Sequence, residues 1–187
     1  SEMCIRDRCN ITGMKTFLLL ALSVFTTSIF ACSDILDSNL RLLDSDDEQN
    51  LCEYSGNVIL VVNVASRCGY TPQYAGLQRL YTKFKDDGLM VIGIPSRDFF
   101  QEYSAESKVA EFCSTEYGVE FPMFATAKVK GKKAHPFYKK LIAASGKEPK
   151  WNFAKYLIGR DGEVIEHYKS SVTPESERLV SAIQAVL

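Results

Sequence analysis

Cysteine is the residue type with the most chemistry to offer in this chain of 187 residues, and it occurs six times. The positions are Cys4, Cys9, Cys32, Cys52, Cys68 and Cys113. None belongs to a C-x-x-C pair and the chain has only two His, so we expect no metal site, and no motif calls for a cofactor. A thiol outside such motifs attacks an electrophile, closes a disulfide or packs in the core.

Cys68 has the sequence surroundings of a nucleophile. It follows a continuous β-branched apolar run at 58–65 and precedes Thr71 and Pro72, a pair typical of a helix N-cap and first turn. The run predicts a strand buried on both faces of a parallel sheet. Free N–H groups and the dipole of the following helix would stabilise a thiolate at this corner. A buried structural Cys is the alternative.

Three further residues are expected at the same edge of the sheet, because ligands gather at the carboxyl ends of parallel strands. Asp98 follows the next apolar strand, 89–95. Trp151 and Asn152 precede a closing hairpin whose first strand should run antiparallel to its neighbours. The side chains of Trp151 and Asn152 could donate two hydrogen bonds toward sulfur. Core packing and a turn position are their respective alternatives.

The elements that must position these residues alternate between strand and helix. After the first strand we expect a helix from 71 to a stop at Gly88, a strand at 89–95, a helix at 104–117, a strand at 123–129, a helix at 136–144, a hairpin of 154–158 and 163–168, and a helix from 173 onward. This order is typical of the thioredoxin-like fold, so we predict an α/β domain with a central mixed sheet flanked by helices.

The N-terminal segment 14–33 has the pattern of a secretory signal peptide. Met14 and Lys15 open an apolar run that ends at the small residue Ala31, and cleavage there would leave Cys32 at the mature N-terminus. The run is too short for a comfortable membrane span. A lipoprotein anchored through Cys32 is the alternative, although Phe30 fits a lipobox poorly.

Residues 1–13 have no periodicity and resemble a translated sequencing-adaptor remnant. We therefore expect a spurious extension there and assign no role to Cys4 or Cys9. The remainder, 34–187, should be one domain that is exported, periplasmic or secreted, into an oxidising compartment.

Cys32 and Cys52 flank a short segment at 36–50 that should form an N-terminal hairpin or arm. In an oxidising compartment the two could pair and staple this arm, with a stabilisation of about 3 kcal/mol from loop entropy.

Three motifs resemble those of glutathione peroxidases. The segment N-V-A-S-R-C-G-Y-T-P-Q-Y-A-G-L at 63–77 is similar to the family's signature around its peroxidatic Cys or selenocysteine. F-P-M-F at 121–124 and K-W-N-F at 150–153 are similar to later family motifs and come in the family's order. The resemblance covers roughly residues 35–187 and implies a thioredoxin fold that reduces hydrogen peroxide or organic hydroperoxides.

The resemblance also implies a catalytic site of Cys68, Trp151, Asn152 and the residue at position 98. The Cys68 thiolate would attack the O–O bond and become a sulfenic acid. Position 98 departs from the family pattern, which has Gln where this chain has Asp98. We expect Asp98 to take the role of that Gln as proton acceptor, and Gln101 is the alternative.

Another thiol must then reduce Cys68. Family members of the two-Cys type carry a resolving Cys in the helix that contains Cys113, which makes Cys113 the candidate, with a core Cys as the alternative. The implied reductant is glutathione or a thioredoxin-like protein. Tetrameric members carry a long insertion where this chain has only 145–150, so we expect a monomer or at most a weak dimer.

Composition excludes other classes of function. With 22 Lys and Arg against 23 Asp and Glu and no basic tract, the net charge is −1, which argues against nucleic-acid binding. A hydrophobic share of 46% excludes wholesale disorder. A rival remains: a thioredoxin-like binding or disulfide-handling module without peroxidase turnover.

Overall fold

The apolar run after residue 57 forms the central strand of a four-stranded sheet. Strand β3 (Val58–Val64) is buried along its whole length. It pairs in parallel with β4 (Leu89–Pro95) and antiparallel with β5 (Lys155–Ile158), and β6 (Val164–Tyr168) completes the order β4-β3-β5-β6. The predicted mixed sheet is confirmed.

The computed structural model describes residues 32–187. The predicted extension at 1–13, with Cys4 and Cys9, lies outside the described residues, as does nearly all of the predicted signal peptide. No helix within the described range is long and apolar enough to cross a membrane.

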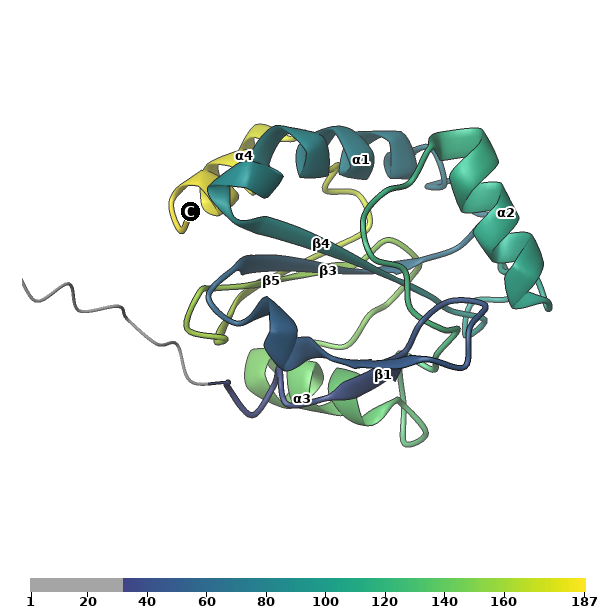
Figure 1. The fold of residues 1–187 in the computed structure, drawn as a ribbon, viewed down its shortest axis with the longest axis horizontal. Coiled ribbons are helices and arrows are strands. Elements are labelled where there is room, and N and C mark those ends of the chain that lie inside the picture. The colour runs from purple at the N-terminus through teal and green to yellow at the C-terminus, as the bar shows by residue number, and fades with distance from the viewer. Residues whose placement is uncertain (1–31) are drawn as a thin grey trace, which may run out of the picture.

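Helices cover both faces of the sheet, so the fold has three layers (Figure 1). The helices are α1 (Gln73–Phe84), α2 (Glu106–Tyr117), α3 (Pro136–Ser145) and α4 (Glu177–Gln184). Helices α1 and α4 lie on one face and α3 on the other, while α2 lies toward the end where β3 and β4 finish. The two faces bury separate apolar clusters, and Cys68 and Cys113 both belong to the cluster under α1.

The start of α1 differs from the expectation in one detail. Thr71 does not cap the helix with its side chain; its hydroxyl accepts the N–H of Cys68 at 2.9 Å and donates to the carbonyl of Ala65 at 2.9 Å. Thr71 therefore closes the turn that carries Cys68. The short 3₁₀ turn η2 (Lys85–Asp87) extends α1 to Gly88, which ends it with a left-handed φ of 100°.

The strand expected at 123–129 is wrong. Met123 and Phe124 form only isolated bridges, to Gly93 of β4 and to Leu42. The segment is held alternately by β4 and by the N-terminal arm, so no continuous ladder develops. The other predicted helices and strands are present; β4 has the predicted ends, and the remaining ends differ by at most four residues.

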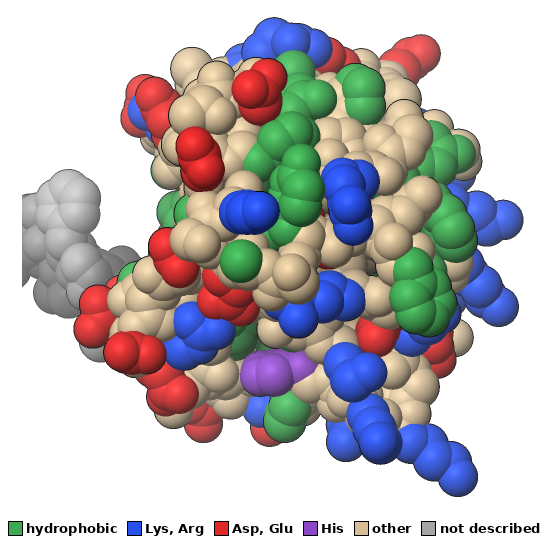
Figure 2. Space-filling view, turned by 90° about the vertical axis from the view of Figure 1, so that its right-hand side faces the viewer, with side chains coloured by type: hydrophobic (Ala, Val, Ile, Leu, Met, Phe, Trp, Pro, Cys, Tyr) green, Lys and Arg blue, Asp and Glu red, His purple; other side chains and the backbone are tan. Residues whose placement is uncertain are grey.

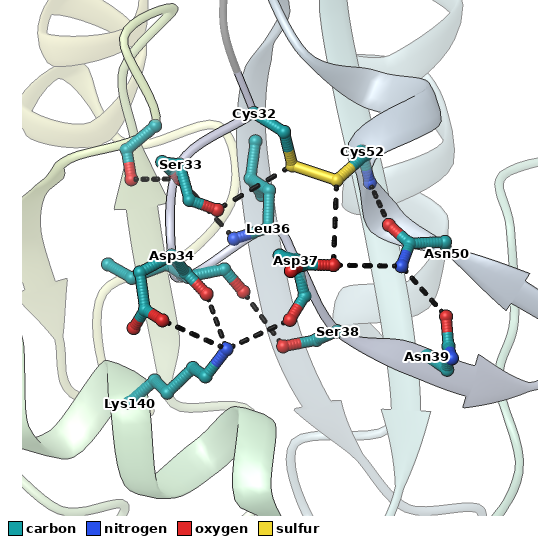
Figure 3. The surroundings of a disulfide bond; sticks show 12 residues. Cys32, Ser33, Asp34, Leu36, Asp37, Ser38, Asn39, Asn50, Cys52 and Lys140 are labelled. Atoms are coloured by element: carbon teal, nitrogen blue, oxygen red, sulfur yellow. Dashed lines mark hydrogen bonds and ion pairs between the residues drawn. A yellow bond between two sulfur atoms is a disulfide. The ribbon is translucent and has the colours of Figure 1, made fainter.

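The N-terminal arm, residues 32–54, contains the expected hairpin, made of β1 (Asn39–Arg41) and β2 (Glu48–Asn50). The 3₁₀ turn η1 (Leu51–Tyr54) follows. A disulfide joins Cys32 to Cys52, whose Cα atoms are 5.3 Å apart (Figure 3). The amine of Lys140 on α3 donates to the carbonyl of Asp37 at 2.9 Å, which ties the arm to that helix.

Candidate active site

Cys68 lies in the turn between β3 and α1, as the sequence predicts. Its side chain is buried, with 7% exposed, and its thiol is not in a disulfide. The backbone N–H of Tyr70 donates to the Cys68 Sγ at 3.4 Å. A strand-to-helix turn with a backbone donor aimed at sulfur is a typical setting for a nucleophilic Cys.

Trp151 and Asn152 reach the same end of the sheet. The side-chain amide of Asn63, the penultimate residue of β3, donates to the Trp151 carbonyl at 3.1 Å. The indole of Trp151 is 42% exposed and packs on the ring of Phe99, with 5.4 Å between centroids, so it is not a core residue. Asn152 is fully buried.

Gln101 completes this group. The side-chain amide of Asn152 donates to the Gln101 Oε1 at 3.1 Å, and the backbone N–H of Arg67 donates to the Gln101 carbonyl at 3.0 Å. The neighbouring Glu102 is buried and accepts the N–H of Ser66 at 3.1 Å. Burial raises the pKa of Glu102, and the hydrogen bonds that it accepts oppose this rise. The loop with Gln101 is thus fastened to the residues just before Cys68.

The Asp98 carboxylate is engaged by the loop at 126–130, and its expected role as the proton acceptor stays a prediction. Its Oδ2 accepts the backbone N–H groups of Val129 at 2.7 Å and Lys130 at 3.3 Å, and its Oδ1 lies 3.7 Å from the amine of Lys128. A carboxylate gains more from these donors than from a position near a thiolate, which would repel it. Gln101, the alternative at the sequence level, is the residue that contacts Asn152.

Two aromatic residues with left-handed backbone flank the Gln101–Asn152 pair. Phe100 has a φ of 59° and Phe153 a φ of 64°, values that bulky residues rarely adopt. Each costs on the order of 1–2 kcal/mol. Phe100 is 93% exposed, so the burial of its side chain does not offset this cost. Backbone strain is therefore concentrated on both sides of the candidate site.

Next to Trp151 is a cleft of about 520 Å³, which sequence patterns could not predict because its walls are distant along the chain. Tyr70, Trp151 and His167 line it together with Lys150 and Lys169, and no carboxylate among residues 32–187 does. Burial lowers the pKa of His167, with a smaller contribution from Lys147. The view onto this end of the molecule shows Lys and Arg side chains gathered toward its lower right (Figure 2).

Cys113 lies on the buried face of α2, with 3% of its side chain exposed. Burial raises the pKa of Cys113 to about 11. The thiol is therefore protonated at neutral pH and is a weak nucleophile while α2 is folded. Among residues 32–187, no cluster of His, Cys, Asp and Glu could hold a metal ion.

A mixed four-stranded sheet with a single buried thiol at the first strand-to-helix corner defines a thioredoxin-like thiol protein. In the solved structure described as Trgpx in apo form, 83% of this chain and 96% of that chain superpose with a TM-score of 0.65 at 32% identity. The fold class predicted from the sequence is confirmed.

The sequence model described as glutathione peroxidase matches residues 37–142. A glutathione peroxidase of Lactococcus lactis is 45% identical over 131 residues, 67% of this chain and 83% of that protein. The thioredoxin/glutathione peroxidase BtuE of Escherichia coli is 38% identical over 170 residues, 77% of this chain and 93% of that protein. The chain belongs to the glutathione peroxidase family and is an enzyme of the peroxidase class.

Proposed function

We propose that the protein reduces hydrogen peroxide or organic hydroperoxides through Cys68. The observation that carries this proposal is the convergence at one sheet edge of the Cys68 thiol, the Tyr70 N–H and the Gln101–Asn152 pair. The thiolate attacks one peroxide oxygen, an S–O bond forms as the O–O bond breaks, and the leaving oxygen takes a proton to become water or alcohol. Cys68 is left as a sulfenic acid.

The polar side chains around the thiol have distinct roles in this scheme. Asn152 holds the Gln101 side chain by its carbonyl oxygen, which leaves the Gln101 amide nitrogen to donate toward the peroxide or the thiolate. The indole of Trp151 forms the exposed wall beside them. Asp98 is not assigned a catalytic role, because its carboxylate is engaged by the loop at 126–130.

A thiol reductant completes the cycle. It attacks the sulfenic acid to form a mixed disulfide and water, and a second thiol releases Cys68. Glutathione and a thioredoxin-like protein are the two candidate reductants, and both words occur in the name of the Escherichia coli relative. Cys113 would act as resolving Cys only after α2 opens, because burial keeps its thiol protonated.

The proposed location is an exported one, periplasmic or secreted, and the proposed state is a monomer. The Cys32–Cys52 disulfide supports export, since such bonds persist in oxidising compartments. A sulfur in this disulfide carries no lipid, so the disulfide and an anchor on Cys32 are mutually exclusive. Intact-mass analysis of purified protein separates them: a diacylglycerol adduct on Cys32 would refute the disulfide-bonded form.

Stopped-flow mixing of the reduced protein with one equivalent of hydrogen peroxide tests the function. We expect peroxide loss far faster than with a free thiol, together with dimedone labelling of Cys68. Peroxide loss at the rate of a free thiol would instead favour the thioredoxin-like module without turnover. Steady-state assays with glutathione and with a thioredoxin system would then identify the reductant.

A further inference from the structure

Lys155, the first residue of β5, has a fully buried side chain. Its amine donates to the side-chain carbonyl of Gln73 and, at 2.6 Å, to the backbone carbonyl of Val172. The ion pairs among residues 32–187 do not include Lys155, so no carboxylate balances its charge. Burial lowers the pKa of Lys155 to about 7.

An amine is a costly choice for this position in the sheet. Lys155 pairs with Val62 in the centre of the sheet, and Phe153 and Leu157, two residues before and after it, belong to the apolar cluster under α1. Removing an ammonium group from water costs several kcal/mol, and two hydrogen bonds to neutral carbonyls offset that cost only in part. Fold stability therefore does not account for a lysine here.

The two acceptors of the amine belong to segments that form the candidate site. Gln73 is the first residue of α1, and its backbone N–H donates to the Tyr70 carbonyl at 2.9 Å. Its side-chain amide donates to the Ser170 carbonyl at 2.7 Å. Tyr70 in turn donates its N–H to the Cys68 sulfur and lines the cleft, and Ser170 lines the same cleft.

A continuous series of hydrogen bonds thus runs from the buried amine to both sides of the cleft. One branch passes through Gln73 and Tyr70 to the sulfur of Cys68. The other passes through the Gln73 amide to Ser170, and the direct bond to Val172 fastens the same loop. Through these hydrogen bonds the amine and Gln73 connect the Cys68 turn with the loop at 170–172.

We propose that Lys155 is a positioning residue that acts through Gln73 to hold the Cys68 turn against the loop at 170–172, at a cost in stability. This inference rests on the proposed peroxidase function. It assigns a task to a side chain that touches neither peroxide nor Cys68. Removing the amine should lower the peroxidase activity and leave the stability of the fold unchanged or higher.

Lys155→Met tests this directly, since Met has a similar length and no charge. We expect a thermal midpoint equal to or above that of the wild type, with a rate of hydrogen peroxide consumption about tenfold lower, as a shift of about 1 Å can cost up to a hundredfold. The loss should be larger for a bulky organic hydroperoxide, because the cleft wall moves as well. Gln73→Met should lower both the thermal midpoint and the rate of peroxide consumption. The double variant Lys155→Met/Gln73→Met should regain the thermal midpoint but not the rate.

Lys140→Met is the matched control, a lysine that binds the arm on the opposite face of the sheet. It should change the midpoint and leave the peroxide rate as it is. A folded Lys155→Met with the wild-type rate overturns the proposal, and so does an equal loss of rate in Lys140→Met. The rate of Cys68 alkylation by iodoacetamide, followed by mass spectrometry, compares the same variants without peroxide. The alkylation measurement tests the role of Lys155 even if the wild-type protein proves not to be a peroxidase.

Discussion

The N-terminal arm and the sheet edge around Cys68 use cysteine in opposite ways. In the arm, Cys32 and Cys52 are joined in a disulfide, and the polar side chains around it, such as Asn50 and Asp37, hydrogen-bond to one another (Figure 3). At the sheet edge the thiol of Cys68 is free. There, side-chain oxygens of Asn152 and Ser66 are buried without a hydrogen-bond partner among the described residues.

The backbone differs between the two regions in the same direction. Phe100 and Phe153 have strained left-handed conformations beside the site, whereas the arm has one such residue, Asp44, a type that tolerates it in turns. Buried oxygens without partners and strained backbone both reduce stability, and they persist where the surrounding structure enforces them. The arm therefore contributes to the stability of the fold, whereas the sheet edge around Cys68 loses stability in holding a reactive geometry.

Replacing Cys68 should have the largest effect. We expect Cys68→Ser to lower peroxide consumption at least about a thousandfold, as loss of a nucleophile does in other enzymes. The midpoint of thermal unfolding should change little, because the two residues are close in size. Stopped-flow assays and thermal scans measure the two quantities. Cys113→Ala is the control and should keep the first turnover; loss of that turnover would assign Cys113 a role in peroxide attack.

Removing the disulfide should lower stability and leave activity unchanged, the reverse of replacing Cys68. The double variant Cys32→Ser/Cys52→Ser should lower the free energy of unfolding by about 3 kcal/mol, since the loop between the two residues regains its freedom in the unfolded chain. The first-turnover peroxide rate should equal that of the wild type. Denaturant unfolding and stopped-flow assays provide the measurements. A fall in this rate would show that the arm contributes to activity as well as to stability.

Within the sheet edge, Gln101 and Asp98 should differ in their effects on activity and stability. Gln101→Ala should lower the peroxide rate about a hundredfold, as loss of one aligned donor does in other active sites. Asp98→Asn should leave the rate nearly unchanged and lower the free energy of unfolding by about 1–2 kcal/mol, since Val129 and Lys130 lose a charged acceptor. The opposite pattern, a slow Asp98→Asn and a fast Gln101→Ala, would restore Asp98 as the catalytic residue.

The smallest effect is expected at Glu106, which joins the arm to α2. It forms an ion pair with Arg41 at 2.7 Å. Burial alone would raise the pKa of Glu106, but hydrogen bonds from Arg41 and from the backbone N–H of Thr126 outweigh it and hold the pKa below its ordinary value. The resulting stability is present above the ordinary pKa of Glu and is lost as the pH falls through the lowered one.

Glu106→Gln should therefore lower the free energy of unfolding by about 1 kcal/mol near neutral pH and by less in acid. Denaturant unfolding from pH 7 down to pH 3 would measure this difference, and the peroxide rate at pH 7 should not change. An equal loss at every pH would show that the carboxylate charge contributes nothing to the arm.

Much of the fold follows from local patterns. The apolar runs that became β3 and β4 could be recognised because strands buried on both faces need continuous β-branched residues. The segment at 123–129 misled because a short apolar stretch does not indicate its partners, and here the partners alternate between β4 and the arm. Helix starts were uncertain by a few residues, since Thr71 hydrogen-bonds backward to Cys68 and not forward into α1.

The candidate site was predictable in part. Cys68, Trp151 and Asn152 stand in motifs whose order along the chain is specific to a family. The choice between Asp98 and Gln101 was not predictable, because it depends on which backbone N–H groups the loop at 126–130 presents to a carboxylate. No pattern of nearby residues in the sequence predicts the cleft or the contacts of Lys155.

The strand-to-helix corner at Cys68, the sheet type and the family follow from the amino-acid sequence alone, because each depends on residue types at fixed short spacing. The packing of distant segments brings Gln101 to Asn152, joins Asp98 to a distant loop and buries Lys155 against Gln73 at the start of α1. These outcomes depend on the competition among distant hydrogen-bond donors and acceptors for one another. That competition is settled only when the chain is packed, because buried polar groups must then find partners or remain without them.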